Sequence, residues 1–300
     1  MSEETVEYGE IVERVWPGQP AEIEVLGGGI TNHNLKVTLA DGSAFVLRIA
    51  GSETHQLGID RRVEREASLA AAAVGVGPEV VAFVEPEGYL VTRFIVGRIV
   101  PLEQMTESAT IRRIATSLRA IHRGPPLPAR FDPFRIVEDY RSTAFARGVK
   151  VPDGYVRARQ VARQISRARG PVPERPCHND LLNANFIDDG ELIRIVDWEY
   201  AGNGDVFFDL ANFSVNNDLA LPARRLLLEA YFGAVRPTDE RALELMRFMS
   251  DFREAMWGVV QTAVSKLDFD FEGYADEHFE RLERTAADPA FQAALNGSES

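Results

Sequence analysis

The stretch Cys177-His178-Asn179-Asp180-Leu181-Leu182-Asn183-Ala184-Asn185 sets three polar side chains at a fixed spacing: His-x-Asp, four residues, then Asn. A carboxylate can orient an attacking hydroxyl and accept its proton, and an amide oxygen is a neutral ligand for Mg²⁺. We therefore predict Asp180 as a catalytic base and Asn185 as a metal ligand, with His178 holding the loop by hydrogen bonds. A plain polar turn is the alternative, because short frames recur by chance.

A second carboxylate follows at the end of a predicted hairpin. Residues 186–187 and 192–196 are predicted strands joined at Asp188-Asp189-Gly190, and the second strand leads directly to Asp197. The same frame and the same following acid occur in the catalytic loop of protein kinases, where the later acid binds Mg²⁺. We predict Asp197 as a catalytic metal ligand. Glu199 is a candidate for a second ion, with a surface acid as the alternative.

The N-terminal part contains candidates for holding a nucleotide. The loop Gly27-Gly28-Gly29-Ile30-Thr31-Asn32 joins two predicted strands, and the backbone N–H groups around Gly28, Gly29, Thr31 and Asn32 are suited to phosphate. Arg48 lies at the end of the strand over 45–49. A cation here, paired with Glu64 or Glu66 on the next helix, is predicted to hold the α- and β-phosphates, and an ordinary exposed ion pair is the alternative.

The pattern along the chain predicts an α+β protein with two lobes. Period-2 alternation and turn residues predict strands at 21–26, 34–39, 44–49, 80–84 and 89–94, around one helix at 59–73. The later part is mainly helical, with predicted helices at 107–122, 156–168, 222–234, 239–267 and 272–287. We predict a small antiparallel-sheet lobe over residues 1–96 that binds nucleotide. Residues 97–300 would form a larger, mainly helical lobe with the catalytic loop and the substrate pocket.

Composition excludes several classes of function. The 300 residues are 26% charged and 45% hydrophobic, as in ordinary globular proteins. With 33 basic and 46 acidic side chains the net charge is −13, which disfavours nucleic acid as a partner and permits a cationic substrate. We expect a cytoplasmic protein without membrane insertion. No stretch reaches the ~18 apolar residues of a membrane helix, and the start does not look like a signal peptide. The single cysteine, Cys177, suits a reducing compartment.

Taken together, these motifs resemble the choline/ethanolamine kinase family, within the aminoglycoside-phosphotransferase-like group of the protein-kinase-like fold. The resemblance runs over residues 27–279. It rests most specifically on His178-Asn179-Asp180 with Asn185, Val196-Asp197-Trp198-Glu199-Tyr200-Ala201, Phe208-Asp209-Leu210-Ala211-Asn212 and Trp257-Gly258-Val259-Val260-Gln261.

The resemblance implies a kinase that uses ATP and Mg²⁺ to phosphorylate the hydroxyl of choline or a related amino alcohol such as ethanolamine. It favours Glu64 over Glu66 as the partner of Arg48. It also implies that the backbone at Phe94 and Ile95 reads adenine, and that Asp180 meets the acceptor hydroxyl.

Tyr200 and Trp257 would wall the acceptor pocket. A quaternary ammonium donates no N–H hydrogen bond, so it needs aromatic faces and negative charge. Burial in the core, among Phe248 and Phe252, is the alternative for Trp257.

Two departures from the family pattern keep other acceptors open. Val260 stands where many eukaryotic relatives have a second Trp, and Asn216, a candidate pocket residue, stands where they have an acid. An aminoglycoside or other antibiotic phosphotransferase and a nucleotide-binding pseudokinase are the rival functions, and a homodimer is left open.

Overall fold

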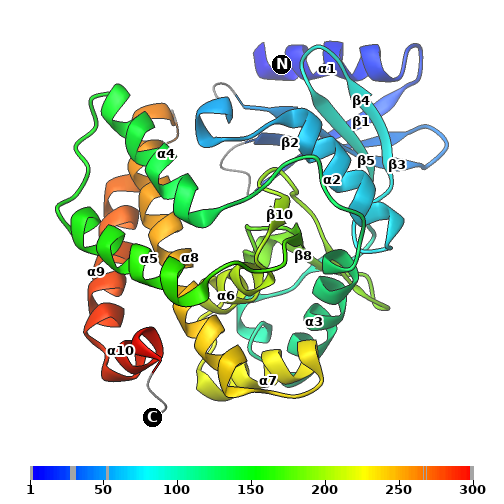
Figure 1. The fold of residues 1–300 in the computed structure, drawn as a ribbon. Helices are drawn as coiled ribbons and strands as arrows, with labels where there is room; N and C mark the ends of the chain where they lie inside the picture. Colours follow the sequence, from blue (N-terminus) through cyan, green and yellow to red (C-terminus); the bar gives the residue numbers. More distant parts are fainter. Residues whose placement is uncertain (1–2, 28–31, 52–53, 266, 268, 298–300) are drawn as a thin grey trace.

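The computed structural model describes residues 3–27, 32–51, 54–265, 267 and 269–297. A five-stranded antiparallel sheet in the order β1-β2-β3-β5-β4 forms the upper right part of Figure 1. Its strands are β1 (Ala21–Leu26), β2 (Asn32–Leu39), β3 (Ala44–Ala50), β4 (Val80–Val84) and β5 (Tyr89–Arg93). This confirms the predicted sheet.

One face of this sheet is apolar because alternate side chains of its strands point the same way. Leu35, Val37 and Leu47 are fully buried, as period-2 alternation requires. A helix that the sequence pattern did not predict, α1 (Glu3–Val15), lies beside the sheet (Figure 1), and the sheet lobe therefore holds more than one helix. Val12, within this helix, and Trp16, directly after it, belong to the same apolar cluster.

Helix α2 (Arg61–Ala73) carries a charged residue into the interior between the lobes. The helix begins after Asp60, whose side chain accepts hydrogen bonds from the backbone N–H groups of Arg62 and Val63. Glu64 falls in its first turn and is buried, with a 2% exposed side chain. A buried carboxylate requires charged partners, and these are Arg48 of β3 and Arg61 of α2.

The rest of the chain is mainly helical, as predicted. Its helices are α3 (Ser108–His122), α4 (Pro133–Ala146), α5 (Gly154–Arg169), α6 (Val206–Asn216), α7 (Leu221–Phe232), α8 (Pro237–Val264), α9 (Phe271–Ala287) and α10 (Pro289–Asn296). Helix α8 spans 28 residues and is buried along most of its length, packing on α4, α6 and α9. Its central position makes it the support for one wall of the site (Figure 1).

Three of these helices, α4, α6 and α10, were missed by the pattern analysis. Pro133 and Pro289 are the first residues of α4 and α10, each after an aspartate that caps the helix. A proline at that position fits a helix start, whereas a run of prolines suggests an extended segment. Helix α6 is buried on nearly all sides, and its buried residues include Asp209, Asn212 and Ser214, so its sequence shows no clear amphipathic stripe.

Short strands connect the two lobes next to the catalytic loop. The predicted hairpin is present as β8 (Phe186–Asp188) and β9 (Ile193–Ile195), joined by β6 (Arg98–Ile99), while β7 (Arg175–Cys177) pairs with β10 (Gly202–Gly204). Gly97 packs so closely on β8 that a Cβ there would lie 2.6 Å from the Asp188 carbonyl oxygen. The lobe boundary at residues 96 and 97 stays a prediction. Among the described helices, none has the length and apolarity needed to cross a membrane.

Candidate active site

His178 holds the catalytic loop through both ring nitrogens. The Asp180 backbone N–H donates to Nδ1 at 3.2 Å, so Nε2 carries the proton and donates to the Val196 carbonyl at 2.9 Å. Burial lowers the pKa of His178, which keeps the ring neutral. The imidazole therefore ties the loop to the strand end before Asp197.

Asp209 of α6 is a second anchor, whose role the sequence did not reveal. Its carboxylate accepts the backbone N–H groups of His178 at 2.8 Å and Asn179 at 2.7 Å, and His122 Nε2 lies 2.9 Å away. Asn179 has a positive φ of 69°, a conformation that asparagine tolerates. Cys177, His122 and Asp209 lie close enough together to hold a metal ion. Both Asp209 carboxylate oxygens, however, already accept hydrogen bonds from the loop backbone, so this cluster fixes the loop.

Asp180, Asn185 and Asp197 come together at the base of the β8–β9 hairpin. The Asn185 side-chain N–H donates to the Asp180 carbonyl at 2.8 Å, and the Val196 N–H donates to the Asn185 carbonyl at 3.0 Å. Asp197 follows directly, with a φ of 70°. Because the amide nitrogen of Asn185 is used by the loop, its amide oxygen is the atom suited to a metal.

A network of buried charges joins α2 and β3 to this hairpin. Arg48 Nη1 lies 3.0 Å from Glu64 Oε1 and also donates to the Asp197 carboxylate. Arg61, one turn before Glu64, contacts Glu64 at 2.7 Å and Glu199 at 3.2 Å. Burial alone would raise the pKa of Asp197, but the positive charge of Arg48 lowers it. Asp197 is thus kept ionised, as a metal ligand must be.

This geometry shows which of the two candidate glutamates on α2 pairs with Arg48. Glu64 meets Arg48, whereas Glu66 is exposed and pairs with its neighbour Arg65. Sequence reasoning missed Arg61, because a cation near a helix start has no special signal.

Asn32 belongs to the same network and links β2 to Glu199. Its side-chain N–H donates to Glu199 Oε2 at 2.8 Å, and its amide oxygen accepts from Arg61 at 2.8 Å. Burial and the nearby Asp197 charge raise the pKa of Glu199 to about 7. Gly28, Gly29 and Thr31, which were predicted to bind phosphate, lie outside the described residues.

A cavity of about 400 Å³ opens between the sheet and the β8–β9 hairpin. Its apolar lining includes Leu26, Phe94, Ile95, Ile187 and Trp198. Its polar lining includes Arg48, Glu64 and Asp197. A cavity with apolar walls and with a cation and carboxylates in its lining has the chemistry needed for a base and its phosphates.

The Asp180 carboxylate lies in a different, buried environment. Burial raises the pKa of Asp180 to about 7, while the positive charge of Arg253 acts in the opposite direction. Arg253 Nη1 on α8 lies 3.2 Å from Asp180 Oδ1 and 2.6 Å from Glu254 Oε1. Neither residue stood out in the sequence, because a charged pair within a long helix usually faces solvent.

Tyr200 and Trp257, which were predicted to wall the acceptor pocket, are in contact, and a protein cation lies over the Tyr200 ring. The Trp257 Nε1–H donates to the Tyr200 hydroxyl at 3.0 Å, and the guanidinium carbon of Arg253 lies 4.4 Å from the centre of the Tyr200 ring. Trp257 is buried in the helical core, where its ring meets Phe271 and Tyr274 edge-on. Asn216 at the end of α6 keeps its amide nitrogen buried without a hydrogen-bond partner.

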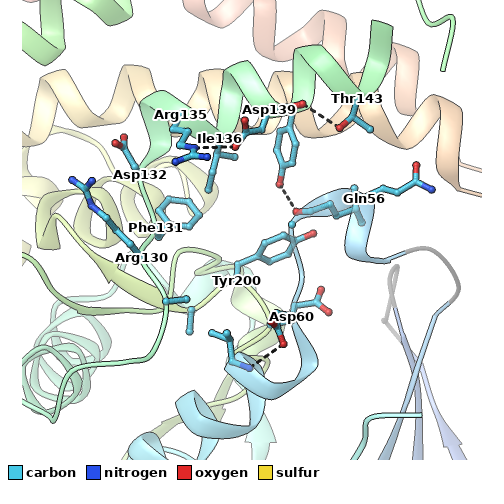
Figure 2. Close-up of a pocket in the computed structure, with 17 residues that line it drawn as sticks. Gln56, Asp60, Arg130, Phe131, Asp132, Arg135, Ile136, Asp139, Thr143 and Tyr200 are labelled. Carbon is cyan, nitrogen blue, oxygen red and sulfur yellow. Dashed lines mark hydrogen bonds and ion pairs between the residues drawn. The ribbon is translucent and has the colours of Figure 1, made fainter. Parts of the chain in front are cut away.

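Tyr200 also lines a second cavity, of about 440 Å³, between α4 and the start of α2 (Figure 2). This cavity shares Glu199 with the charge network. Four carboxylates line it, from Asp60, Asp132, Asp139 and Glu199, against two guanidinium groups from Arg130 and Arg135. The excess of acids suits a cationic ligand.

Comparison with known proteins places this site in a family. The profile of the phosphotransferase enzyme family matches residues 22–246. The crystal structure of a choline/ethanolamine kinase family protein from Mesorhizobium loti has a TM-score of 0.84 and 32% identity, over 97% of this chain and 98% of that one. The chain belongs to the choline/ethanolamine kinase family of phosphotransferases. The fold and the enzyme class predicted from the sequence are thereby confirmed.

More distant relatives agree. Protein LicA from Haemophilus influenzae is 27% identical over 78% of this chain and 72% of its own length. Ethanolamine kinase 2 from Rattus norvegicus is 26% identical over 87% of this chain and 75% of its own length. The choline kinase LicA from Streptococcus pneumoniae shares the fold, with a TM-score of 0.80 and 20% identity over 95% of this chain and 99% of that one.

Proposed function

We propose that the protein transfers the γ-phosphoryl group of ATP to the hydroxyl of choline or a related amino alcohol such as ethanolamine, with Mg²⁺. The main support is that Asp180, Asn185 and Asp197 meet at one end of the β8–β9 hairpin. Asn185 is hydrogen-bonded to the Asp180 backbone on one side and to Val196, the residue before Asp197, on the other. Positioning and charge stabilisation account for most of the catalysis of phosphoryl transfer.

ATP binding is supported by the cavity at the lobe junction. Its apolar walls, with Phe94 and Ile95 at the segment between β5 and β6, suit adenine, and Arg48 in its polar lining suits the phosphates. The pairing of Arg48 with Glu64 fixes the guanidinium. A complex of LicA with AMP, of the same fold at a TM-score of 0.77, is in keeping with this assignment.

Mg²⁺ fits the donor set on the hairpin. The Asn185 amide oxygen and the ionised Asp197 carboxylate are hard oxygen ligands, and Glu199 is the candidate for a second ion. When bound, the ion would neutralise charge on the phosphates. The positive charge of Arg48 already balances the negative charge of Asp197, so this carboxylate is ionised and held in place without the metal.

The acceptor hydroxyl would meet Asp180. The carboxylate orients the hydroxyl and takes its proton as the bond to phosphorus forms. The acid-rich cavity beside Tyr200 offers a place for the ammonium group of an amino alcohol. We expect the enzyme to act in the cytoplasm, and chromatography with light scattering would test the open question of a homodimer.

An ADP-release assay tests this function directly. Purified protein with ATP and Mg²⁺ is given choline, ethanolamine, thiamine or an aminoglycoside. We expect turnover with the small amino alcohols. Turnover only with the aminoglycoside would favour the antibiotic-phosphotransferase alternative. ATP binding by calorimetry without turnover on any alcohol would support the pseudokinase alternative.

A further inference from the structure

Arg253 is an unusual side chain to find beside a catalytic base. Its side chain is 1% exposed, and its guanidinium lies between Asp180, Glu254 and the face of Tyr200. Its Nε and Nη2 atoms are buried without hydrogen-bond partners. A buried cation with unpaired donors is costly, so it requires a reason beyond stability.

Arg253 covers one face of the Tyr200 ring, so this face is not available to a cationic acceptor. With the guanidinium carbon 4.4 Å from the ring centre, no second cation fits over that face of Tyr200. The Tyr200 hydroxyl is also engaged, because it accepts a hydrogen bond from the Trp257 Nε1–H. Arginine stays charged at any pH of interest, so this positive charge is permanent.

The nearby negative charge is also committed. Glu254 accepts hydrogen bonds from Arg253 at 2.6 Å and from the Tyr274 hydroxyl at 3.1 Å. Asn216 on α6 is neutral and adds no charge. A trimethylammonium group, which relies on aromatic faces and unpaired carboxylates, therefore finds one face of Tyr200 and the Glu254 carboxylate already used.

A primary ammonium has a different option. It donates N–H hydrogen bonds, and the other carboxylates that line the adjoining cavity, from Asp60, Asp132 and Asp139, can accept them. We propose, building on the alcohol-kinase function above, that Arg253 is a specificity-determining residue. It occupies the cation position over Tyr200 and so selects acceptors with a primary amine over those with a quaternary ammonium.

The test compares ethanolamine, its mono- and dimethyl derivatives and choline with the wild-type enzyme and with Arg253→Met. We expect kcat/KM of the wild type to fall with each added methyl group. In the variant, the choline-to-ethanolamine ratio of kcat/KM should rise about tenfold, within the range of a cation over an aromatic face. Arg247→Met, on the same helix but hydrogen-bonded to Ser214, should keep the wild-type ratio.

Arg253→Met leaves two acids without their cation, so Arg253→Met/Glu254→Gln is the second variant. Calorimetry with tetramethylammonium gives a readout that needs no turnover, and we expect binding to this double variant about tenfold tighter than to the wild type. Equal binding, or an unchanged acceptor ratio in an active enzyme, would overturn the role of Arg253 while leaving the kinase function intact. A wild type that phosphorylates none of the four acceptors would instead overturn the proposed acceptor class, and tighter tetramethylammonium binding to the double variant would then still support the role of Arg253.

Discussion

Arg48 of β3 and Glu64 of α2 form a buried ion pair, with Nη1 and Oε1 3.0 Å apart. The same Arg48 nitrogen donates to Asp197 after β9. Three segments that are distant in sequence thus share one cation, and all three residues line the cavity between the sheet and the β8–β9 hairpin.

The Arg48–Glu64 ion pair should support nucleotide binding. Glu64→Gln removes the charge that fixes Arg48, so steady-state assays should show KM for ATP raised by about tenfold, the effect of losing one charge-assisted hydrogen bond. Glu66→Gln is the matched control, because Glu66 is exposed on the same helix. Equal KM values for the two variants would mean that Glu64 has no part in nucleotide binding.

Asp209 should support both stability and turnover. Asp209→Ala leaves the His178 and Asn179 N–H groups buried without acceptors, which should lower the free energy of unfolding by about 3 kcal/mol. Displacement of the loop should also lower kcat by about 10²-fold, with little change in KM for ATP.

Urea denaturation and kinetics at a temperature where the variant is folded check both effects of Asp209→Ala. Glu229→Ala, at an exposed site on α7, serves as the control. If the variant unfolds like the control, the carboxylate does not anchor the loop.

The ion pair between Arg113 and Asp188 makes stability depend on pH. Two hydrogen bonds of 2.7 Å from Arg113 lower the pKa of Asp188 to about 2. Because the folded pKa lies below the unfolded value, the stabilisation is complete above about pH 5 and is lost as the pH falls towards 2. Asp188→Asn should therefore cost about 1 kcal/mol at pH 7 and progressively less towards pH 3.

Urea unfolding of wild type and Asp188→Asn across this pH range measures the difference. Asp276→Asn, at an exposed position on α9, controls for a general change in net charge. A difference between wild type and Asp188→Asn that stays constant from pH 7 to pH 3 would contradict the assigned ion pair.

The sequence predicted those parts of the site that are contiguous or locally spaced. The frame from His178 to Asn185 and the following Asp197 lie on one loop and one hairpin, so their chemistry can be read from spacing alone. The five strands were also predictable, because residue types alternate along them and turn residues separate them.

The remainder depends on packing between distant segments. Asp209 and Arg253 reach the loop from α6 and α8, and a single sequence does not say which residues of a buried helix face a catalytic loop. Trp257 shows the same limit, since the pattern predicted it either as pocket wall or as core. The structure buries it in the core while placing its N–H on Tyr200.

The most direct measurement is the turnover of Asp180→Asn compared with wild type, on the acceptor that the ADP-release assay identifies. Asparagine keeps the shape of the side chain but cannot take the proton of the acceptor hydroxyl. We expect kcat to fall by roughly 10²–10⁴-fold with KM for ATP nearly unchanged. Turnover at the wild-type rate would contradict the assignment of Asp180 as the base.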